Sequence, residues 1–166
     1  MARSNEVERT VRPSVLDRLM DDEPRIAADP PLTWAQSVER YKVSVLRDLE
    51  WLLNTRRISE EAPRELEELH RSVYDFGLPD VSSMSADAPS DRQRLARRVK
   101  EVIRIHEPRL ADVRVLIPEE KVGPARLVRF VVEGTLRMEP NPEQVVFDTV
   151  LEVASGRFRV GGGDDA

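Results

Sequence analysis

The chain contains no cysteine and only two histidines among its 166 residues. Without cysteine it has no disulfide framework and no thiolate chemistry, which fits a reducing compartment. His106 falls on the apolar face of a predicted helix, where a structural histidine is the simplest interpretation, and His70 lies in a charged segment, where we expect it to be solvated. Because a metal site needs several converging His, Asp or Glu side chains, we predict no metal site and no cofactor.

Long apolar runs and recognisable catalytic motifs are also missing. No run approaches the roughly 20 apolar residues of a membrane-spanning helix, and the N-terminal sequence MARSNEVERT lacks the apolar core of a secretory signal. The chain has no Gly-rich phosphate-binding loop, no GxSxG nucleophile motif and no HExxH zinc motif. We therefore expect a cytoplasmic protein with no direct membrane insertion, and we nominate no catalytic residue.

Charge is what the sequence has in abundance: 34% of its residues are charged, and the net charge is −5. Residues 91–109 contain seven basic and three acidic side chains, so this segment carries +4 and the rest of the chain −9. The simplest interpretation is a solvated outer helix face, and docking to an acidic protein surface ranks second. Nucleic-acid binding ranks third, because neither aromatic residues nor a known reader motif accompany the arginines.

Carboxylates are numerous enough that counting alone does not exclude a paired-carboxylate hydrolase. Most of them fall in short acidic runs typical of solvated faces, at residues 21–23, 60–61, 65–68 and 119–120. A general acid needs a carboxyl group in an apolar cleft. Only Glu107 has a sequence context that indicates partial burial, and its expected partner is Arg109 or an arginine of another protein.

Two long helices are predicted from apolar residues at spacings of three and four. One extends from about residue 33 to 54, with Thr33 as its cap, and the other from 91 to about 107, where Pro108 prevents its continuation. Trp51 lies off the apolar stripe of the first helix. We interpret it as a partly buried edge residue rather than as a partner contact.

Two shorter helices are predicted as well. Ser14 can cap one whose apolar side consists of Val15, Leu16 and Leu19. Pro63 can start the other, with its inward side formed by Leu66, Leu69 and Val73. Gly77 then suits a left-handed position after that helix. We expect residues 1–32 to be a flexible segment that contains the first of these short helices.

The sequence period changes to two after Pro108. Alternating apolar residues predict strands near residues 113–117, 128–138, 145–153 and 157–160, and the short turns between them favour antiparallel pairing of neighbours. The predicted fold class is therefore α+β, with N-terminal helices packed on a small, mainly antiparallel C-terminal sheet. The main domain is expected to span residues 33–160, followed by a flexible tail at 161–166.

The last predicted strand carries Arg157 and Arg159 and is expected at an edge of the sheet. Arginines on a short edge strand resist casual aggregation. The free backbone groups of such an edge can pair with a strand from a partner. Arg157 and Arg159 are therefore candidate partner-binding residues.

Glu107, Pro108 and Arg109 place two opposite charges around a rigid residue, at the point where the basic helix stops and the strands begin. One interpretation is helix termination combined with an internal ion pair. The other is an arginine and a carboxylate presented at a rigid corner to a partner. The residues alone leave both interpretations open.

Three blocks of sequence, in this order and spacing, carry a resemblance to a known family: RDLEWLLNTRR at residues 47–57, YDFGLPD at 74–80 and IHEPRL at 105–110. The chain resembles the TssE family of type VI secretion baseplate subunits, which is related to the "lysozyme-like" baseplate wedge proteins of contractile phage tails. The resemblance extends from about residue 14 to 160. Asp75 and Phe76 depart from the family pattern, which usually has a tyrosine before the glycine.

The resemblance implies a structural, non-enzymatic baseplate component that is cytoplasmic and docked at an inner-membrane complex. It implies partners: TssF and TssG in the wedge, TssK indirectly, and the sheath proteins TssB and TssC, which add strands to an existing sheet. The family's Glu-Pro-Arg motif, which anchors the subunit to its wedge partners, maps onto Glu107, Pro108 and Arg109. Two alternatives are a peptidoglycan hydrolase, as the "lysozyme-like" label suggests, and a cytoplasmic regulatory protein-binding module.

Overall fold

The computed structural model describes residues 11–20, 24–25, 32–60, 62–63, 65–81, 83–118 and 127–162. The chain divides into two compact units, residues 1–44 and 45–166. Most of the predicted flexible tail and large parts of the predicted N-terminal segment lie outside the described residues. So do two of the acidic runs, at 21–23 and 119–120.

The first unit contains helix α1 (Val15–Leu19) and the start of helix α2 (Trp34–Asn54). Ser14 caps α1 as predicted, because its hydroxyl accepts from the Asp17 amide at 3.1 Å while its own amide donates to the Asp17 carboxylate at 3.2 Å. The start of α2 is also capped as predicted, with Thr33 Oγ1 accepting from the Gln36 amide at 3.3 Å.

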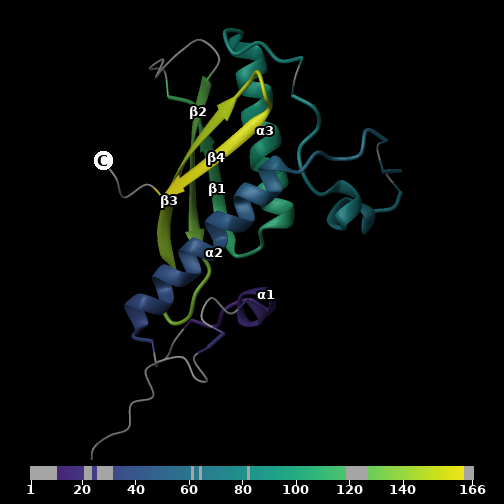
Figure 1. The fold of residues 1–166 in the computed structure, drawn as a ribbon. Coiled ribbons are helices and arrows are strands. Elements are labelled where there is room, and N and C mark those ends of the chain that lie inside the picture. Colours follow the sequence, from purple (N-terminus) through teal and green to yellow (C-terminus); the bar gives the residue numbers. More distant parts are fainter. Residues whose placement is uncertain are drawn as a thin grey trace, which may run out of the picture. The chain divides into compact units, whose positions relative to one another are not determined.

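The second unit contains a four-stranded sheet in the order β1-β2-β3-β4, with every neighbouring pair antiparallel (Figure 1). This confirms the α+β prediction and the antiparallel meander. The strands are β1 (Leu110–Leu116), β2 (Leu127–Leu136), β3 (Glu143–Glu152) and β4 (Arg157–Gly162). β4 therefore extends two residues into the stretch that was predicted to be a tail.

β1 begins three residues earlier than the alternation of apolar residues predicted. Its pairing with β2 is irregular between Ala111 and Arg114, and Asp112 between them adopts a positive φ of 52°. Asp tolerates this left-handed conformation better than most residues. The bulge shifts the alternation by one residue, which is why the period of two is visible in the sequence only from Val113 onward.

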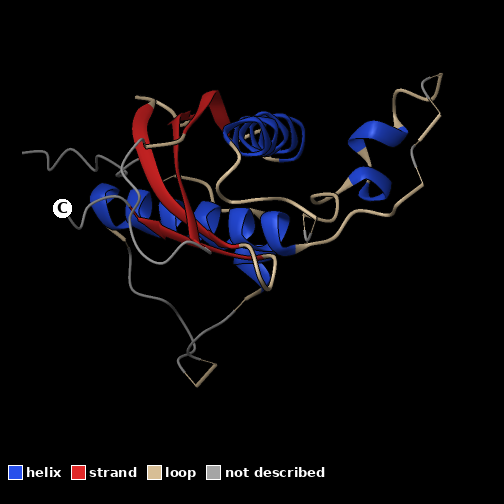
Figure 2. Ribbon diagram, turned by 90° about the horizontal axis from the view of Figure 1, so that it is seen from above, coloured by secondary structure: helices blue, strands red, loops and turns tan. Residues whose placement is uncertain are grey.

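One face of the sheet forms the core of the second unit. The buried side chains alternate along the strands, with Phe130 and Leu151 fully buried and Phe158 1% exposed. Helix α3 (Pro89–His106) and residues 45–54 of α2 bury their apolar stripes and cover this face (Figure 2). The opposite face of the sheet carries polar and partly exposed side chains, so the sheet is amphipathic as its period predicted.

The prediction of a helix that starts at Pro63 is wrong. The chain forms instead two short 3₁₀ helices, η1 (Leu69–Arg71) and η2 (Val73–Asp75). Leu66 and Val73, expected to face inward, are 51% and 89% exposed. Ser72 interrupts the helix because its backbone is extended and its hydroxyl accepts from the Tyr74 amide, a local bond that competes with helical pairing.

The start of the basic helix was also predicted slightly too late. α3 begins at Pro89 rather than at Asp91. Proline is favoured at the first helical position because its missing N–H has no intrahelical partner there in any case. The helix ends at His106, with Glu107 as its cap, as Pro108 predicted.

Candidate functional site

The corner formed by Glu107, Pro108 and Arg109 is a tight turn. The Glu107 amide donates to Ile103 O at 2.8 Å and closes α3, and the Leu110 amide donates back to Glu107 O at 3.1 Å. Arg109 O accepts from the Arg137 amide at 2.8 Å, just beyond the end of β2. These bonds fix the path of the backbone from α3 into β1, and Pro108 is left exposed at the tip of the turn.

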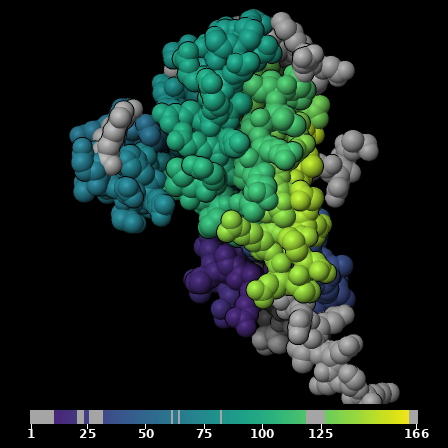
Figure 3. Space-filling view, turned by 180° about the vertical axis from the view of Figure 1, so that it is seen from behind, coloured from purple at the N-terminus to yellow at the C-terminus, as the bar shows by residue number. Residues whose placement is uncertain are grey.

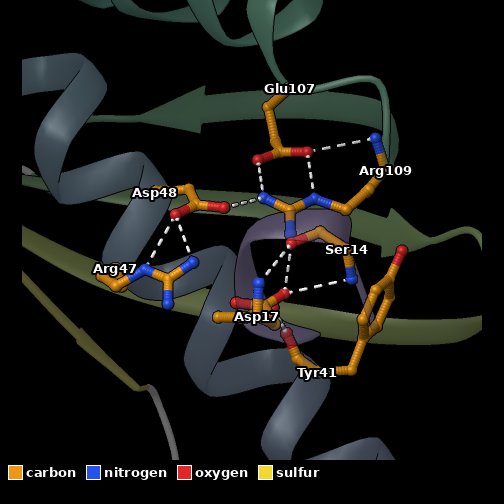
Figure 4. Close-up of polar contacts among 8 residues, drawn as sticks. Ser14, Asp17, Tyr41, Arg47, Asp48, Glu107 and Arg109 are labelled. Atoms are coloured by element: carbon orange, nitrogen blue, oxygen red, sulfur yellow. Dashed lines mark hydrogen bonds and ion pairs between the residues drawn. The ribbon is translucent and has the colours of Figure 1, made fainter. Parts of the chain in front are cut away.

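The two charges of this corner face each other. The Glu107 carboxylate, in a residue only 4% exposed, accepts from the Arg109 amide at 3.2 Å, from its Nε at 2.6 Å and from its Nη2. Arg109 Nη2 also donates to Asp48 Oδ2 at 2.6 Å (Figure 4). Asp48 Oδ1 in turn accepts from Arg47 Nε at 2.9 Å and Nη2 at 2.8 Å.

Four alternating charges therefore run from Arg47 through Asp48 and Arg109 to Glu107, linking the first and third resemblance blocks. Burial by itself lowers the pKa of Arg109, but the hydrogen bonds and charges of Glu107 and Asp48 outweigh it and raise that pKa. Removing one member of a buried charge pair leaves the other uncompensated, at a cost of about 3–5 kcal/mol. The internal ion pair is thus present, and a contact with a partner stays a prediction.

Asp75, one of the residues that departs from the family pattern, is the centre of a second polar cluster. Its carboxylate accepts from Arg57 Nη1 at 2.9 Å and lies 3.0 Å from His70 Nδ1. Its carbonyl oxygen lies 3.2 Å from His106 Nε2, and His106 also meets the Phe76 ring edge-on. Asp75 therefore joins the segment after α2, the 3₁₀ helices and the end of α3.

Burial tends to raise the pKa of Asp75, but the His70 hydrogen bond and the Arg57 charge outweigh it and the pKa is lowered. Burial lowers the pKa of His106, and its bond to the Asp75 carbonyl offsets this only in part. His106 is thus a structural histidine with a polar partner, as expected. His70 is not simply solvated, since it pairs with Asp75. No periodicity in the sequence pointed to this cluster.

Gly77 allows the second block to meet the end of the first. Its φ is +102°, and a Cβ at this position would lie 2.2 Å from Thr55 O. The Leu78 amide donates to Thr55 O and the Arg57 amide donates to Leu78 O, both at 2.9 Å. A glycine is therefore required where this loop touches the segment after α2, as the sequence predicted for a left-handed position.

The outer side of β4 is the second candidate site. In the described part of the chain β3 is its only strand neighbour, so β4 lies at an edge of the sheet as predicted. Asn54, the last residue of α2, reaches this edge: its Oδ1 accepts from the Phe158 amide and its Nδ2 donates to Phe158 O, both at 2.9 Å. The side chains of Arg157 and Arg159 are exposed on the face of the sheet opposite to buried Phe158.

A half-open hollow of about 550 Å³ adjoins this edge. Its lining includes Trp51, Asn54, Pro79, Arg157 and Phe158. Trp51 is 51% exposed, more than the partly buried edge position that we favoured, and the Arg47 guanidinium lies 5.1 Å from its ring centre. The hollow therefore offers an aromatic surface beside the open strand.

Most basic side chains of α3 are exposed, namely Arg94, Arg97, Lys100 and Arg104. The α3 segment forms part of the molecular surface in Figure 3. Arg98 pairs with Glu101 at 2.9 Å within the helix, and the pair is about half exposed. This agrees with the solvated face that we ranked first. Among the described residues, no group of three His, Asp or Glu side chains converges as a metal site would require. None of the described helices combines the length and the hydropathy that a membrane span needs.

A family model matches the chain. It is described as baseplate wedge protein gp25, and the match covers residues 39–141, more than half of the sequence. This range includes Asn54, Gly77 and the Glu107–Arg109 corner, whereas β3 and β4 follow it. No curated protein matches the chain.

Proposed function

The chain belongs to the baseplate wedge protein gp25 family, and from that premise we propose that it is the TssE-type baseplate subunit of a type VI secretion system. The observation that carries this proposal is the family match, which encloses all three sequence blocks that resemble TssE. The subunit joins the baseplate wedge and initiates assembly of the contractile sheath. It acts in the cytoplasm, in a baseplate docked at the inner-membrane complex.

The wedge contact is assigned to the corner of Glu107, Pro108 and Arg109, with TssF and TssG as direct partners and TssK as an indirect one. The buried pair of Glu107 and Arg109 supports this role by holding the corner in one shape. Exposed Pro108 is the part of the corner that a partner meets first. A fixed corner lowers the entropy that is lost on binding.

The sheath contact is assigned to the edge of β4, where a strand from TssB or TssC adds to the sheet. An edge strand with exposed arginines supports this assignment, because backbone groups supply affinity and the side chains supply specificity. Arg157 and Arg159 are the side chains that we propose to contact the added strand.

We propose no enzymatic activity, in spite of the lysozyme-like label of the family. A general acid must carry a proton that it can give. Glu107, the carboxylate for which we expected burial, instead accepts three hydrogen bonds from Arg109. This arrangement serves structure rather than proton transfer.

The test is an affinity pull-down from native cells with the tagged full chain. Wild type and Arg98→Ala, which removes only an exposed pair, are expected to recover wedge and sheath proteins. Arg109→Ala is expected to lose the wedge proteins. Because Arg109→Ala removes a buried charge, Pro108→Arg serves as a second variant that changes the exposed tip and leaves the ion pairs in place.

Normal recovery of wedge proteins by both corner variants would overturn the anchoring role. If wild type recovers a single unrelated regulator, the regulatory-module alternative replaces the proposed function. If it recovers nothing, the baseplate role is rejected, and a peptidoglycan turnover assay with the purified protein tests the hydrolase alternative.

A further inference from the structure

Asn54 occupies the edge of β4 in the way that a neighbouring strand would. A carboxamide offers one acceptor and a donor group, as a peptide unit does. Here the acceptor takes the Phe158 amide and the donor reaches the Phe158 carbonyl, with both bonds at 2.9 Å. The side chain therefore satisfies one outward-facing residue of the edge strand.

The remaining outward groups of β4 follow from the alternation of a strand. In an antiparallel pair, successive residues point their N–H and C=O groups to opposite sides. The backbone N–H and C=O of Phe158 point outward to Asn54, so those of Val160 and Gly162 point outward as well. The backbone groups of Arg157 and Arg159 point the other way, toward β3. Within the described ranges, no strand or side chain bonds to the outward groups of Val160 and Gly162.

The side chains of β4 define the chemistry that suits a neighbour. On the helix-covered face Phe158 and Val160 are buried, and on the other face Arg157 and Arg159 are exposed, with no carboxylate in the strand. A neighbouring strand would set apolar residues beside the first pair and acidic residues beside the arginines. Two copies of β4 would instead set arginines beside arginines, which disfavours self-pairing.

We propose that Asn54 blocks pairing at Phe158 and so directs an incoming partner strand to Val160 and Gly162, and that this strand alternates apolar and acidic residues. The inference rests on the proposed function and adds to it the register and the chemistry of the added strand. Asn54 acts as a register stop. Without it, pairing can slide by two residues toward Arg157, which keeps the faces but changes which acidic residue meets which arginine.

The test uses the full chain and synthetic octapeptides as probes: alternating Val-Glu, alternating Val-Lys, and a Val-Glu peptide with N-methylated backbone amides. Amide hydrogen exchange is followed at Phe158, Val160 and Gly162. The Val-Glu peptide is expected to slow exchange at Val160 and Gly162 and to leave Phe158 unchanged. The Val-Lys and N-methylated peptides are expected to produce no such protection.

Asn54→Ala and Asn54→Asp test the register stop. In Asn54→Ala the Phe158 amide is expected to exchange faster without peptide and to gain protection with the Val-Glu peptide. Asn54→Asp keeps the acceptor for the Phe158 amide, so that amide should stay protected without peptide. A Phe158 amide that does not respond to Asn54→Ala would overturn the stop.

Equal protection by the Val-Glu and Val-Lys peptides would overturn the proposed partner chemistry. The edge is not a site for a foreign strand if none of the peptides slows exchange of the Val160 amide. The same conclusion follows if that amide becomes protected without peptide when the protein concentration is raised. If wild type still recovers wedge and sheath proteins in the pull-down, such a failure leaves the proposed function standing. If wild type recovers no baseplate proteins, the proposed function fails whatever the peptides do.

Discussion

At the corner of Glu107 and Arg109 the charged side chains turn inward and bond to one another, whereas on β4 the arginines face solvent and, beyond Phe158, the outer backbone edge has no strand neighbour among the described residues. Both regions were nominated from the sequence by their charges. The corner uses charge to fix the joint between α3 and β1, at the cost of burying it. The edge uses charge only to flank a surface whose affinity would come from backbone groups. The two regions therefore use charge differently: paired charges inside the fold set the shape of the corner that we propose as the wedge contact, and exposed arginines flank the edge that we propose as the sheath contact.

The largest effect that this contrast predicts is on stability at the corner. Arg109→Ala leaves buried Glu107 without its partner and should lower the free energy of unfolding by about 3–5 kcal/mol. The control Arg98→Ala removes an exposed pair and should cost about 0–1 kcal/mol. Urea unfolding of both variants measures the difference. Equal, small losses would mean that the corner charges are no more structural than those on the surface of α3.

A smaller effect is predicted where Asn54 meets the edge. Asn54→Ala removes two hydrogen bonds to Phe158, but water can replace them at an edge, so the loss should be about 0.5–1.5 kcal/mol. Thermal or urea unfolding measures it. A loss as large as that of Arg109→Ala would show that the edge is built into the core, which would remove the contrast between the two regions.

The pH dependence of stability separates the corner from the Asp75 cluster. The pKa of His106 is lowered in the folded state from the ordinary histidine value of 6.5. As the pH falls through that ordinary value, His106 therefore binds a proton more readily in the unfolded chain than in the folded one. The free energy of unfolding should therefore fall as the pH drops from about 7.5 to about 5.5, while Asp75, whose pKa is lowered, stays ionised. His106→Gln should flatten this slope in urea unfolding curves. An unchanged slope would place the sensitivity elsewhere.

The smallest effect on stability is expected on β4 itself. Arg157→Glu/Arg159→Glu changes two exposed side chains and should alter the free energy of unfolding by no more than about 0.5 kcal/mol. The same change should abolish the preference for an acidic peptide over a basic one in the exchange assay. A variant that is stable and still prefers the acidic peptide would show that these arginines do not select the strand.

Local patterns in the sequence were enough to predict the order and pairing of the strands and the helix caps at Ser14 and Thr33. The alternation of Val128, Phe130 and Val132 along the strand predicted which face of β2 is buried. The short turns predicted that strands adjacent in sequence pair antiparallel, as β2 and β3 do. The cap at Ser14 depends on residues within one turn of helix. Such features are set by near neighbours in the chain, so a single sequence contains the information.

Contacts between distant residues were not predicted. The bond from Arg109 to Asp48 spans 61 positions and that from Asn54 to Phe158 spans 104. The Asp75 cluster depends on a loop that the helical pattern after Pro63 misrepresented. In each case the partner is chosen by the tertiary fold, and the sequence offers many equivalent carboxylates and amides.

The central claim is that the corner and the edge serve different partners, and the pull-down with Arg157→Glu/Arg159→Glu tests it most directly. Quantified beside wild type and Pro108→Arg, the β4 variant should retain wedge proteins and lose sheath proteins, while Pro108→Arg should lose wedge proteins. Loss of both groups by the β4 variant, or retention of both, would contradict the division of the molecule into a wedge-binding corner and a sheath-binding edge.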